Sequence, residues 1–272
     1  MSATLQEAPR DLFLNPFVPV VTSEDAVLFI LDDGAQIAVS GSAHPVVETA
    51  RQGTPVTVAD LVEGFGRTEA IALMRAGVFT ESAFDLAGRH SRTEGVFHRA
   101  GRLEKYRESV RTAHVLVLGA GAIGSHVAWS LAAAGVGRLT ILDHDVIERS
   151  NLNRQLLYFP SDVGRLKTEV LAQRLKSLDE ELECRRIDRR IASAADALAV
   201  IRQAAPDLVV KAIDEPLNVT AWVNAACVQL GVPYVQGGFV NGDGIVGPTY
   251  VPGQTPCHGC YAGAEVENAV RT

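Results

Sequence analysis

The chain is poor in cysteine, aromatic side chains and positive charge. It holds four cysteines in 272 residues, and aromatic residues make up 6% of the sequence. Because only Cys257 and Cys260 are close together, a disulfide framework is excluded and a reducing compartment is expected. The net charge of −7 gives no basic excess for counterion release, so we expect no nucleic-acid partner.

A membrane span and a secretory signal are also missing. The longest stretch without Asp, Glu, Lys or Arg runs from Val115 to Gly137, and its serines and five glycines fit a soluble strand, turn and buried helix better. Residues 1–10 are polar and acidic rather than basic and then apolar. We therefore expect a cytoplasmic protein without a membrane partner.

Charge is divided unevenly along the chain. Residues 1–88 contain 12 acidic residues and four arginines, a net charge of −8, so the other 184 residues have a net charge of +1. This asymmetry indicates two units. We expect a flexible tail over 1–10, a small domain over 11–86, a polar connector over 87–113 and a larger domain over 114–272.

The first domain is expected to be a small α+β domain of winged-helix type. Residues 26–31 and 36–39 are short apolar runs around a turn signal, which predicts a hairpin. Residues 45–51, 58–65 and 68–76 predict three short helices, the second capped by Thr57. Val78 and Phe79 then return as a strand. A generic accessory domain is the alternative.

The second domain alternates apolar strands with helices, which predicts a Rossmann-like, doubly wound and mostly parallel α/β sheet. Directly after its first strand, Gly119, Gly121 and Gly124 form GxGxxG, a pattern that lets a backbone approach phosphate at a helix start. Asp143 ends the second strand, where a carboxylate can accept from a ribose hydroxyl. An NAD-dependent dehydrogenase explains these features equally well.

Two cations follow that a dehydrogenase does not need. Arg154 lies beyond the second strand, and Lys167 starts the next helix 13 residues later. Two positive charges so near the ribose site suit a triphosphate. Asp214 ends the fourth strand, at the edge where open α/β sheets bind ligands, and could hold magnesium.

The strings LVLGAGAIGS, DHDVIERSNLNRQ and TPCHGC together resemble the ThiF/MoeB superfamily of ubiquitin-activating-type adenylyltransferases, over about residues 89–260. The resemblance implies that Asp143 binds ribose and that Asn151, Arg154 and Lys167 bind ATP, with Asp214 on magnesium. In that family an upstream arginine reaches the ATP of the opposite subunit. Here Arg92 takes that role, and a homodimer is implied.

Cys257 and Cys260 form half of a structural zinc site with four thiolates. The family supplies the second CxxC further along, beyond Thr272. Either residues are missing at the C-terminus, so that the adenylation domain is incomplete, or zinc is absent.

The first domain resembles the PqqD-like leader-recognition domain of peptide-modifying enzymes, through its paired strands, TVADLVEGF and IALMRAGVF. The fusion resembles the microcin-type and PaaA branch of the superfamily. It implies an ATP-dependent adenylyltransferase that activates a carboxylate of a ribosomally made precursor peptide bearing a leader. One alternative is activation of a ubiquitin-like or sulfur-carrier protein, and another is a non-catalytic protein that docks a precursor.

Overall fold

The computed structural model describes residues 11–31, 34–40, 44–81, 83–84, 86–99, 103–240 and 243–262. The predicted tail over 1–10 and the turn residues Asp32 and Asp33 lie outside these ranges. The chain divides into two units, Met1–Arg107 and Glu108–Thr272, and each is described by itself. None of the described helices is long and apolar enough to cross a membrane.

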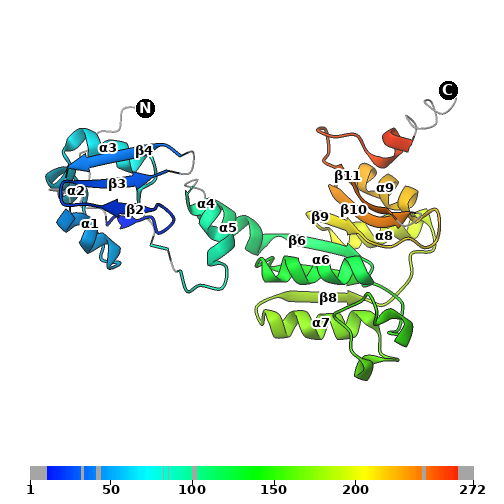
Figure 1. Ribbon diagram of the computed structural model, residues 1–272. Coiled ribbons are helices and arrows are strands. Elements are labelled where there is room, and N and C mark those ends of the chain that lie inside the picture. The colour runs from blue at the N-terminus through cyan, green and yellow to red at the C-terminus, as the bar shows by residue number, and fades with distance from the viewer. Residues whose placement is uncertain are drawn as a thin grey trace. The chain divides into compact units, whose positions relative to one another are not determined.

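The first unit combines short helices with antiparallel strands (Figure 1). Its elements are β1 (Phe13–Leu14), β2 (Val20–Thr22), β3 (Ala26–Ile30), β4 (Gln36–Ser40), α1 (His44–Arg51), α2 (Val58–Phe65), α3 (Arg67–Arg75), β5 (Phe79–Thr80) and α4 (Ser91–Arg99), and α5 (Leu103–Thr112) begins there. The predicted hairpin is confirmed, since Val27 pairs with Val39 and Ile30 with Gln36. The predicted cap is also present, because the Thr57 hydroxyl accepts from the Asp60 amide at 3.2 Å.

Two features of this unit were not expected from the sequence. β5 pairs with β1 rather than joining the hairpin sheet, whose order is β2-β3-β4. The segment expected to be a polar connector contains α4, a helix that tertiary contacts hold. Arg107 on α5 forms two hydrogen bonds with Glu94, at 2.8 and 3.0 Å, and Phe97 stacks on Tyr106. These partners are distant in sequence, so local patterns do not reveal the helix.

The second unit is the predicted doubly wound sheet. Its elements are β6 (His114–Leu118), α6 (Ala122–Ala133), β7 (Arg138–Leu142), η2 (Arg149–Asn151), η3 (Pro160–Asp162), α7 (Lys167–Leu178), β8 (Glu183–Ile187), α8 (Ala194–Ala204), β9 (Leu208–Lys211), α9 (Val219–Leu230), β10 (Tyr234–Val240) and β11 (Asp243–Tyr250). The strand order is β11-β10-β9-β6-β7-β8. All neighbours are parallel except β10 and β11.

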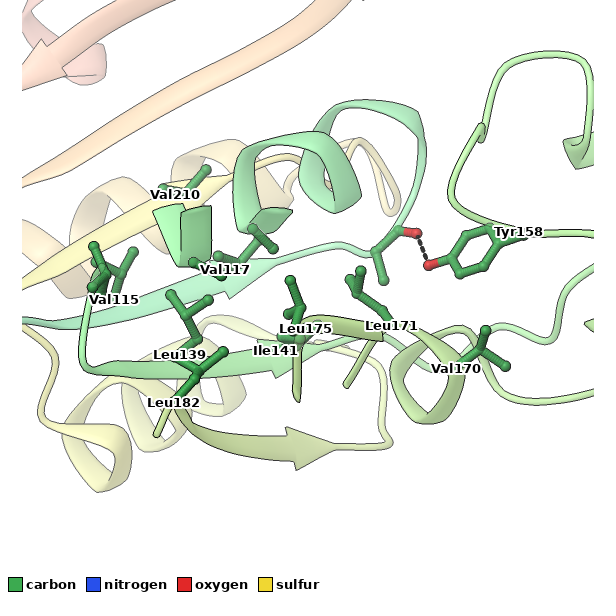
Figure 2. Packing of buried hydrophobic residues seen from close by; sticks show 14 of the residues in the cluster. Val115, Val117, Leu139, Ile141, Tyr158, Val170, Leu171, Leu175, Leu182 and Val210 are labelled. Carbon is green, nitrogen blue, oxygen red and sulfur yellow. Dashed lines mark hydrogen bonds between the residues drawn. The ribbon is translucent and has the colours of Figure 1, made fainter. Parts of the chain in front are cut away.

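Two apolar cores cover the two faces of this sheet. On one face, α6 and α7 contribute Ala128, Leu171 and Leu175 to a core with Leu139 and Ile141, as Figure 2 shows in part. On the other face, residues of α8 and α9 pack with Leu116, Leu118 and Val209. Burial on both faces explains why the strands are continuous apolar runs.

Strand β11 was not expected, because its sequence contains two glycines and Pro248. It lies at the edge of the sheet, and Pro248 falls at a register irregularity between the Val235–Thr249 and Gly237–Val246 pairs, two settings in which strands tolerate proline. The edge position therefore explains why an unfavourable sequence forms a strand.

Candidate functional site

A cleft of about 950 Å³ opens at the carboxyl ends of the parallel strands in the second unit. It is lined by residues at or just after the ends of β6, β7 and β9 and by residues within β10 and β11. From β6 the chain continues to β7 and β8 on one side, and it then crosses to β9 and β10 on the other side. Open α/β sheets usually bind ligands at the point where the strand order reverses in this way. Six predicted site residues line it: Gly119, Gly121, Asp143, Arg154, Lys167 and Asp214.

The glycine motif forms the tight turn between β6 and α6. Gly119 has φ +102°, a conformation that favours glycine, and a side chain there would meet the Ala212 carbonyl oxygen at 2.6 Å. Gly124 packs so closely that an added Cβ would lie 1.9 Å from the Gly119 oxygen. At Gly121, by contrast, a Cβ would have no neighbour nearer than 3.9 Å. Gly121 caps α6 and therefore leaves open space at a helix N-terminus, which suits a phosphate.

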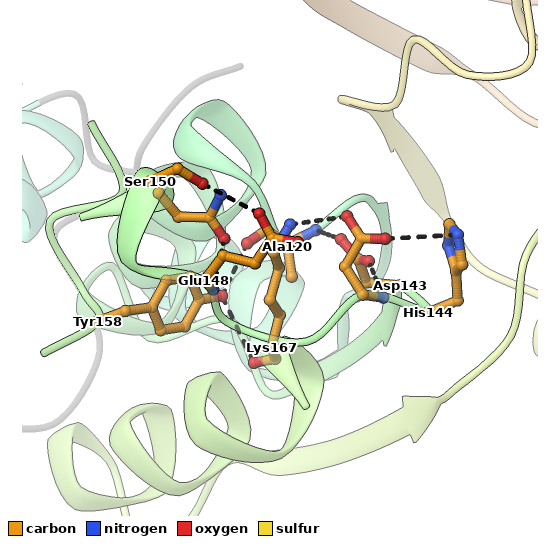
Figure 3. Close-up of polar contacts among 9 residues, drawn as sticks. Ala120, Asp143, His144, Glu148, Ser150, Tyr158 and Lys167 are labelled. Atoms are coloured by element: carbon orange, nitrogen blue, oxygen red, sulfur yellow. Dashed lines mark hydrogen bonds and ion pairs between the residues drawn. The ribbon is translucent and has the colours of Figure 1, made fainter. Parts of the chain in front are cut away.

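Asp143 holds the loops around this turn in place. One carboxylate oxygen accepts from the Ala120 amide at 2.6 Å, and the other accepts from the Asp145 amide at 2.8 Å (Figure 3). Each oxygen keeps a second lone pair, so the carboxylate can also accept from a ribose hydroxyl.

Lys167 is buried at the start of α7, with its Nζ 2.7 Å from Asp145 Oδ2. Burial alone would raise the pKa of Asp145, but the hydrogen bond and charge of Lys167 outweigh it, and the pKa is lowered. The Tyr158 hydroxyl donates to the Ala120 carbonyl at 2.7 Å and links the segment after β7 to the glycine turn (Figures 2 and 3). Burial raises the pKa of this hydroxyl.

Arg154 is exposed and donates to the Ser150 carbonyl and to Asn153 Oδ1, at 2.9 and 3.1 Å. Asn151 is not among the residues lining the cleft. Its side chain accepts from the Glu148 amide at 3.0 Å, so in this structure it shapes the turn that carries Arg154. Gln155, which sequence reasoning did not single out, lines the cleft and is 4% exposed. Within the part of the chain that the structure describes, its Oε1 has no hydrogen-bond partner.

This cleft fits a nucleotide with its metal. Its volume matches small-ligand sites, and it combines a bare helix start at Gly121 with the unpaired acceptor of Gln155. The Asp214 carboxylate is exposed at the rim, and carboxylate oxygens are the ligands that magnesium prefers.

Comparison with known proteins assigns the family. The ThiF family matches residues 92–271. The chain belongs to the ThiF family. A sulfur carrier protein adenylyltransferase of Thermus thermophilus is 39% identical to it over 158 residues, 57% of each chain. The ThiS adenylyltransferase of Bacillus subtilis is 34% identical over 181 residues, 66% of this chain and 52% of its own length. The chain thus spans little more than half of these relatives.

Solved structures with this ThiF-family fold cover more of the chain. Escherichia coli MccB with ATP has a TM-score of 0.72 and 27% identity, and covers 96% of this chain and 80% of its own. The microcin C7 biosynthetic enzyme MccB in complex with N-formylated MccA has a TM-score of 0.71 and 28% identity, and covers 93% of this chain and 75% of its own.

The remaining predicted site residues are not among those that line the cleft. Arg92 is exposed on α4, in the first unit, and its place in a partner's site stays a prediction. Cys257 and Cys260 have sulfur atoms 3.6 Å apart. Burial would raise the pKa of Cys257, but hydrogen bonds from Cys260 and nearby groups lower it, which favours the thiolate that zinc binds. Among the described residues, no further His, Cys, Asp or Glu completes a metal cluster with them.

Proposed function

We propose that this ThiF-family chain is an ATP-dependent adenylyltransferase that activates a carboxylate of a ribosomally made precursor peptide. The proposal rests on the share of this chain that each group of similar proteins covers. The MccB structures, solved with ATP and with MccA, cover 96% and 93% of the chain, whereas the sulfur-carrier relatives cover 57% and 66%. Structural coverage this high means that the MccB structures contain a counterpart of the first unit, which supports a peptide substrate.

In the proposed reaction, a carboxylate oxygen of the peptide attacks the α-phosphorus of ATP. The new bond joins the acyl oxygen to Pα, the bond from Pα to the bridging oxygen breaks, and pyrophosphate leaves. Arg154 and Lys167 neutralise phosphate charge, while the amides at the start of α6 position the phosphates. Asp214 would hold magnesium, which supplies further charge neutralisation. No protein nucleophile is needed.

The proposed leader binds as an added strand on β4. Of the two edges of the β2-β3-β4 sheet, β2 has one outward acceptor already engaged, because the Arg51 guanidinium donates to the Val20 carbonyl. The Leu31 amide donates to the Ala35 carbonyl, so these two residues form a hydrogen-bonded pair of the hairpin. Hydrogen-bonded and non-hydrogen-bonded pairs alternate along an antiparallel hairpin, so Ala38 belongs to a non-hydrogen-bonded pair and its amide points away from β3. An outward amide on an edge strand is the group that strand addition uses.

Leader binding is tested with two proline variants of the full chain. Ala38→Pro removes an outward amide of β4, and Thr22→Pro removes the matching amide of β2. Fluorescence polarisation with the labelled leader of a precursor encoded beside this protein should give an affinity of about 1 μM for the wild type. Ala38→Pro should lose it and Thr22→Pro should keep it. The reverse result would place the leader on β2.

The nucleotide is tested by isothermal titration of the full chain with ATP and magnesium, and separately with NAD. We expect binding of ATP well above that of NAD. Binding of NAD without ATP would contradict the proposal and favour a dehydrogenase.

The proposed assembly is a homodimer in which Arg92 completes the neighbouring site. A mixture of Arg92→Ala and Asp214→Ala proteins should regain activity in heterodimers that carry one intact site. A strictly monomeric, active protein in light scattering would contradict this.

Cys257 and Cys260 are proposed as half of a zinc site, to be tested by metal analysis of the purified protein.

A second candidate is activation of a sulfur-carrier protein, which the 39% identity to the Thermus thermophilus enzyme favours. Pyrophosphate exchange dependent on a carrier protein, and unaffected by Ala38→Pro, would support this reading over the peptide.

A further inference from the structure

A second buried lysine, Lys211, lines the cleft at the end of β9 and is 8% exposed. Among the described residues, its Nζ donates no hydrogen bond and forms no ion pair. Burial lowers the pKa of Lys211, and the charge of Asp214 opposes this effect only in part. The contrast with Lys167 is direct, because Lys167 is equally buried but has Asp145 at 2.7 Å.

The position of Lys211 in the strand places it beside Gln236. Val209 packs into the core under α8 and α9, and Val210 packs into the core on the opposite face of the sheet. Since side chains alternate between the two faces of a strand, Lys211 lies on the same face as Val209. On β10 the same alternation places Gln236 on the face of Tyr234, and Gln236 is the register partner of Lys211. The Gln236 amide donates to the Gly247 carbonyl at 2.8 Å, which leaves one N–H for a ligand.

An ammonium on a largely buried side chain that faces a cleft is poorly solvated, and an anion that binds in the cleft pairs with it favourably. Two anions of the proposed reaction could do so: a phosphate of ATP or the carboxylate of the peptide. Arg154 follows β7 and Lys167 begins α7, on one side of β6, whereas Lys211 ends β9 on the other side and pairs in register with Leu118, directly before the glycine turn. The phosphates therefore already have their cations.

The surroundings of Lys211 suit an acyl chain. The cleft on this side is lined by four apolar or aromatic side chains that are 43–93% exposed: Leu217, Phe239, Ile245 and Tyr261. Exposed apolar side chains beside a buried cation match a peptide that ends in a carboxylate, and not a triphosphate.

We propose that Lys211 and Gln236 form the subsite that receives the reacting carboxylate of the substrate, so that the cleft selects a carboxylate over a carboxamide. The inference rests on the proposed function and names the substrate-binding residues for it. In this role Lys211 acts as a hydrogen-bond donor and transfers no proton. It donates to one carboxylate oxygen while the other attacks the α-phosphorus, and it reduces the repulsion between the two anions as they meet.

The test uses the full chain and saturation-transfer difference NMR. The probes are a mixture of N-acetyl amino acids and a matched mixture of their carboxamides, each with and without magnesium and an ATP analogue that has a methylene between the α and β phosphates. The wild type should bind the acids more tightly than the amides. Lys211→Met should lose this preference by about tenfold, as expected for one charged hydrogen bond, and Lys211→Arg should retain it.

A second variant protects the test against a folding defect at position 211. Gln236→Glu places a carboxylate beside Lys211 and should also abolish the preference for acids. Titration of the analogue should be unchanged in both variants. If Lys211→Met loses nucleotide affinity instead, Lys211 is a phosphate ligand and the inference is wrong. If the wild type binds acids and amides alike, it is also wrong. Failure of the proposed function shows separately, as absent nucleotide binding in the wild type.

Discussion

The two halves of the cleft differ in how far their polar side chains find hydrogen-bond or ion-pair partners within the protein itself. Beside β7 and α7, Asp143 accepts two amides, Lys167 pairs with Asp145, and Tyr158 ties the following segment to the glycine turn. Beside β9 and β10, the largely buried Lys211 has no hydrogen-bond or ion-pair partner among the residues that the structure describes. The first half is preorganised by its own contacts, whereas the second half becomes satisfied only when an anion binds. The variants below change one half at a time.

The largest effect is expected at Asp162, which anchors the segment that carries Arg154. Its buried carboxylate accepts from the Phe159 amide at 2.8 Å and pairs with Arg174. Asp162→Ala should lower the free energy of unfolding by about 3 kcal/mol, since it leaves a largely buried guanidinium without its partner. Glu180→Ala, at an exposed site, is the control, and chemical denaturation measures both. Equal stability of the two variants would contradict the anchor.

The contribution of Asp162 should depend on pH. Burial would raise the pKa of Asp162, but the Phe159 amide and Arg174 lower it below 3.8. A carboxyl whose folded pKa is lowered stabilises the fold above its unfolded pKa and ceases to do so as pH falls through the folded value. The stability difference between wild type and Asp162→Ala should therefore be full above pH 3.8 and diminish below it.

Gly124 and Gly121 form a matched pair within the nucleotide half. Gly124→Ala would bring Cβ to 1.9 Å from a backbone oxygen and should lower stability by about 3 kcal/mol. Gly121→Ala has space for its methyl group and should keep its stability, but the methyl group takes the place of a phosphate and ATP affinity should fall. Thermal unfolding and titration separate the two. Loss of stability in Gly121→Ala would show that this glycine serves the fold.

At Lys167 the expected effect is on nucleotide affinity. Lys167→Ala removes a charged donor from the phosphates and should weaken ATP binding by about 10- to 100-fold. Lys176→Ala changes an exposed lysine on the same helix and should have no effect. If the two variants bind ATP equally, Lys167 only pairs with Asp145 and does not bind phosphate. The half of the cleft beside β7 and α7 would then not be the phosphate-binding half.

The smallest effect concerns the unpaired ammonium in the other half. Lys211→Met removes a buried charge and should raise the unfolding temperature by about 3 °C, equivalent to about 1 kcal/mol. Since burial lowers the pKa of Lys211, its penalty is complete below the folded pKa and vanishes as pH rises above the unfolded value of 10.5. The advantage of the variant in scanning calorimetry should therefore shrink toward that pH. A destabilised Lys211→Met would indicate an internal partner.

The same contrast explains what sequence reasoning found. The nucleotide half is built from residues close together in the chain, because a strand, a glycine turn and a helix are one local motif and Asp143 ends the next strand. Lys211 also carried a signal, as the one charged residue within the apolar run LVVKAI, but a lysine at a strand end is usually solvated. Its burial depends on β6 and β10, which are distant in sequence.

The sequence by itself determined the α/β fold, the hairpin, the cap at Thr57 and the glycine turn. These follow from periodicity, capping chemistry and the special backbone of glycine, which act over a few residues. Only the tertiary structure decided that α4 is a helix, that the edge of the sheet accepts Pro248, that Asp145 pairs with Lys167, and that Lys211 is buried unpaired beside Gln236. Those outcomes depend on contacts between distant segments, whose free energies local propensity does not contain.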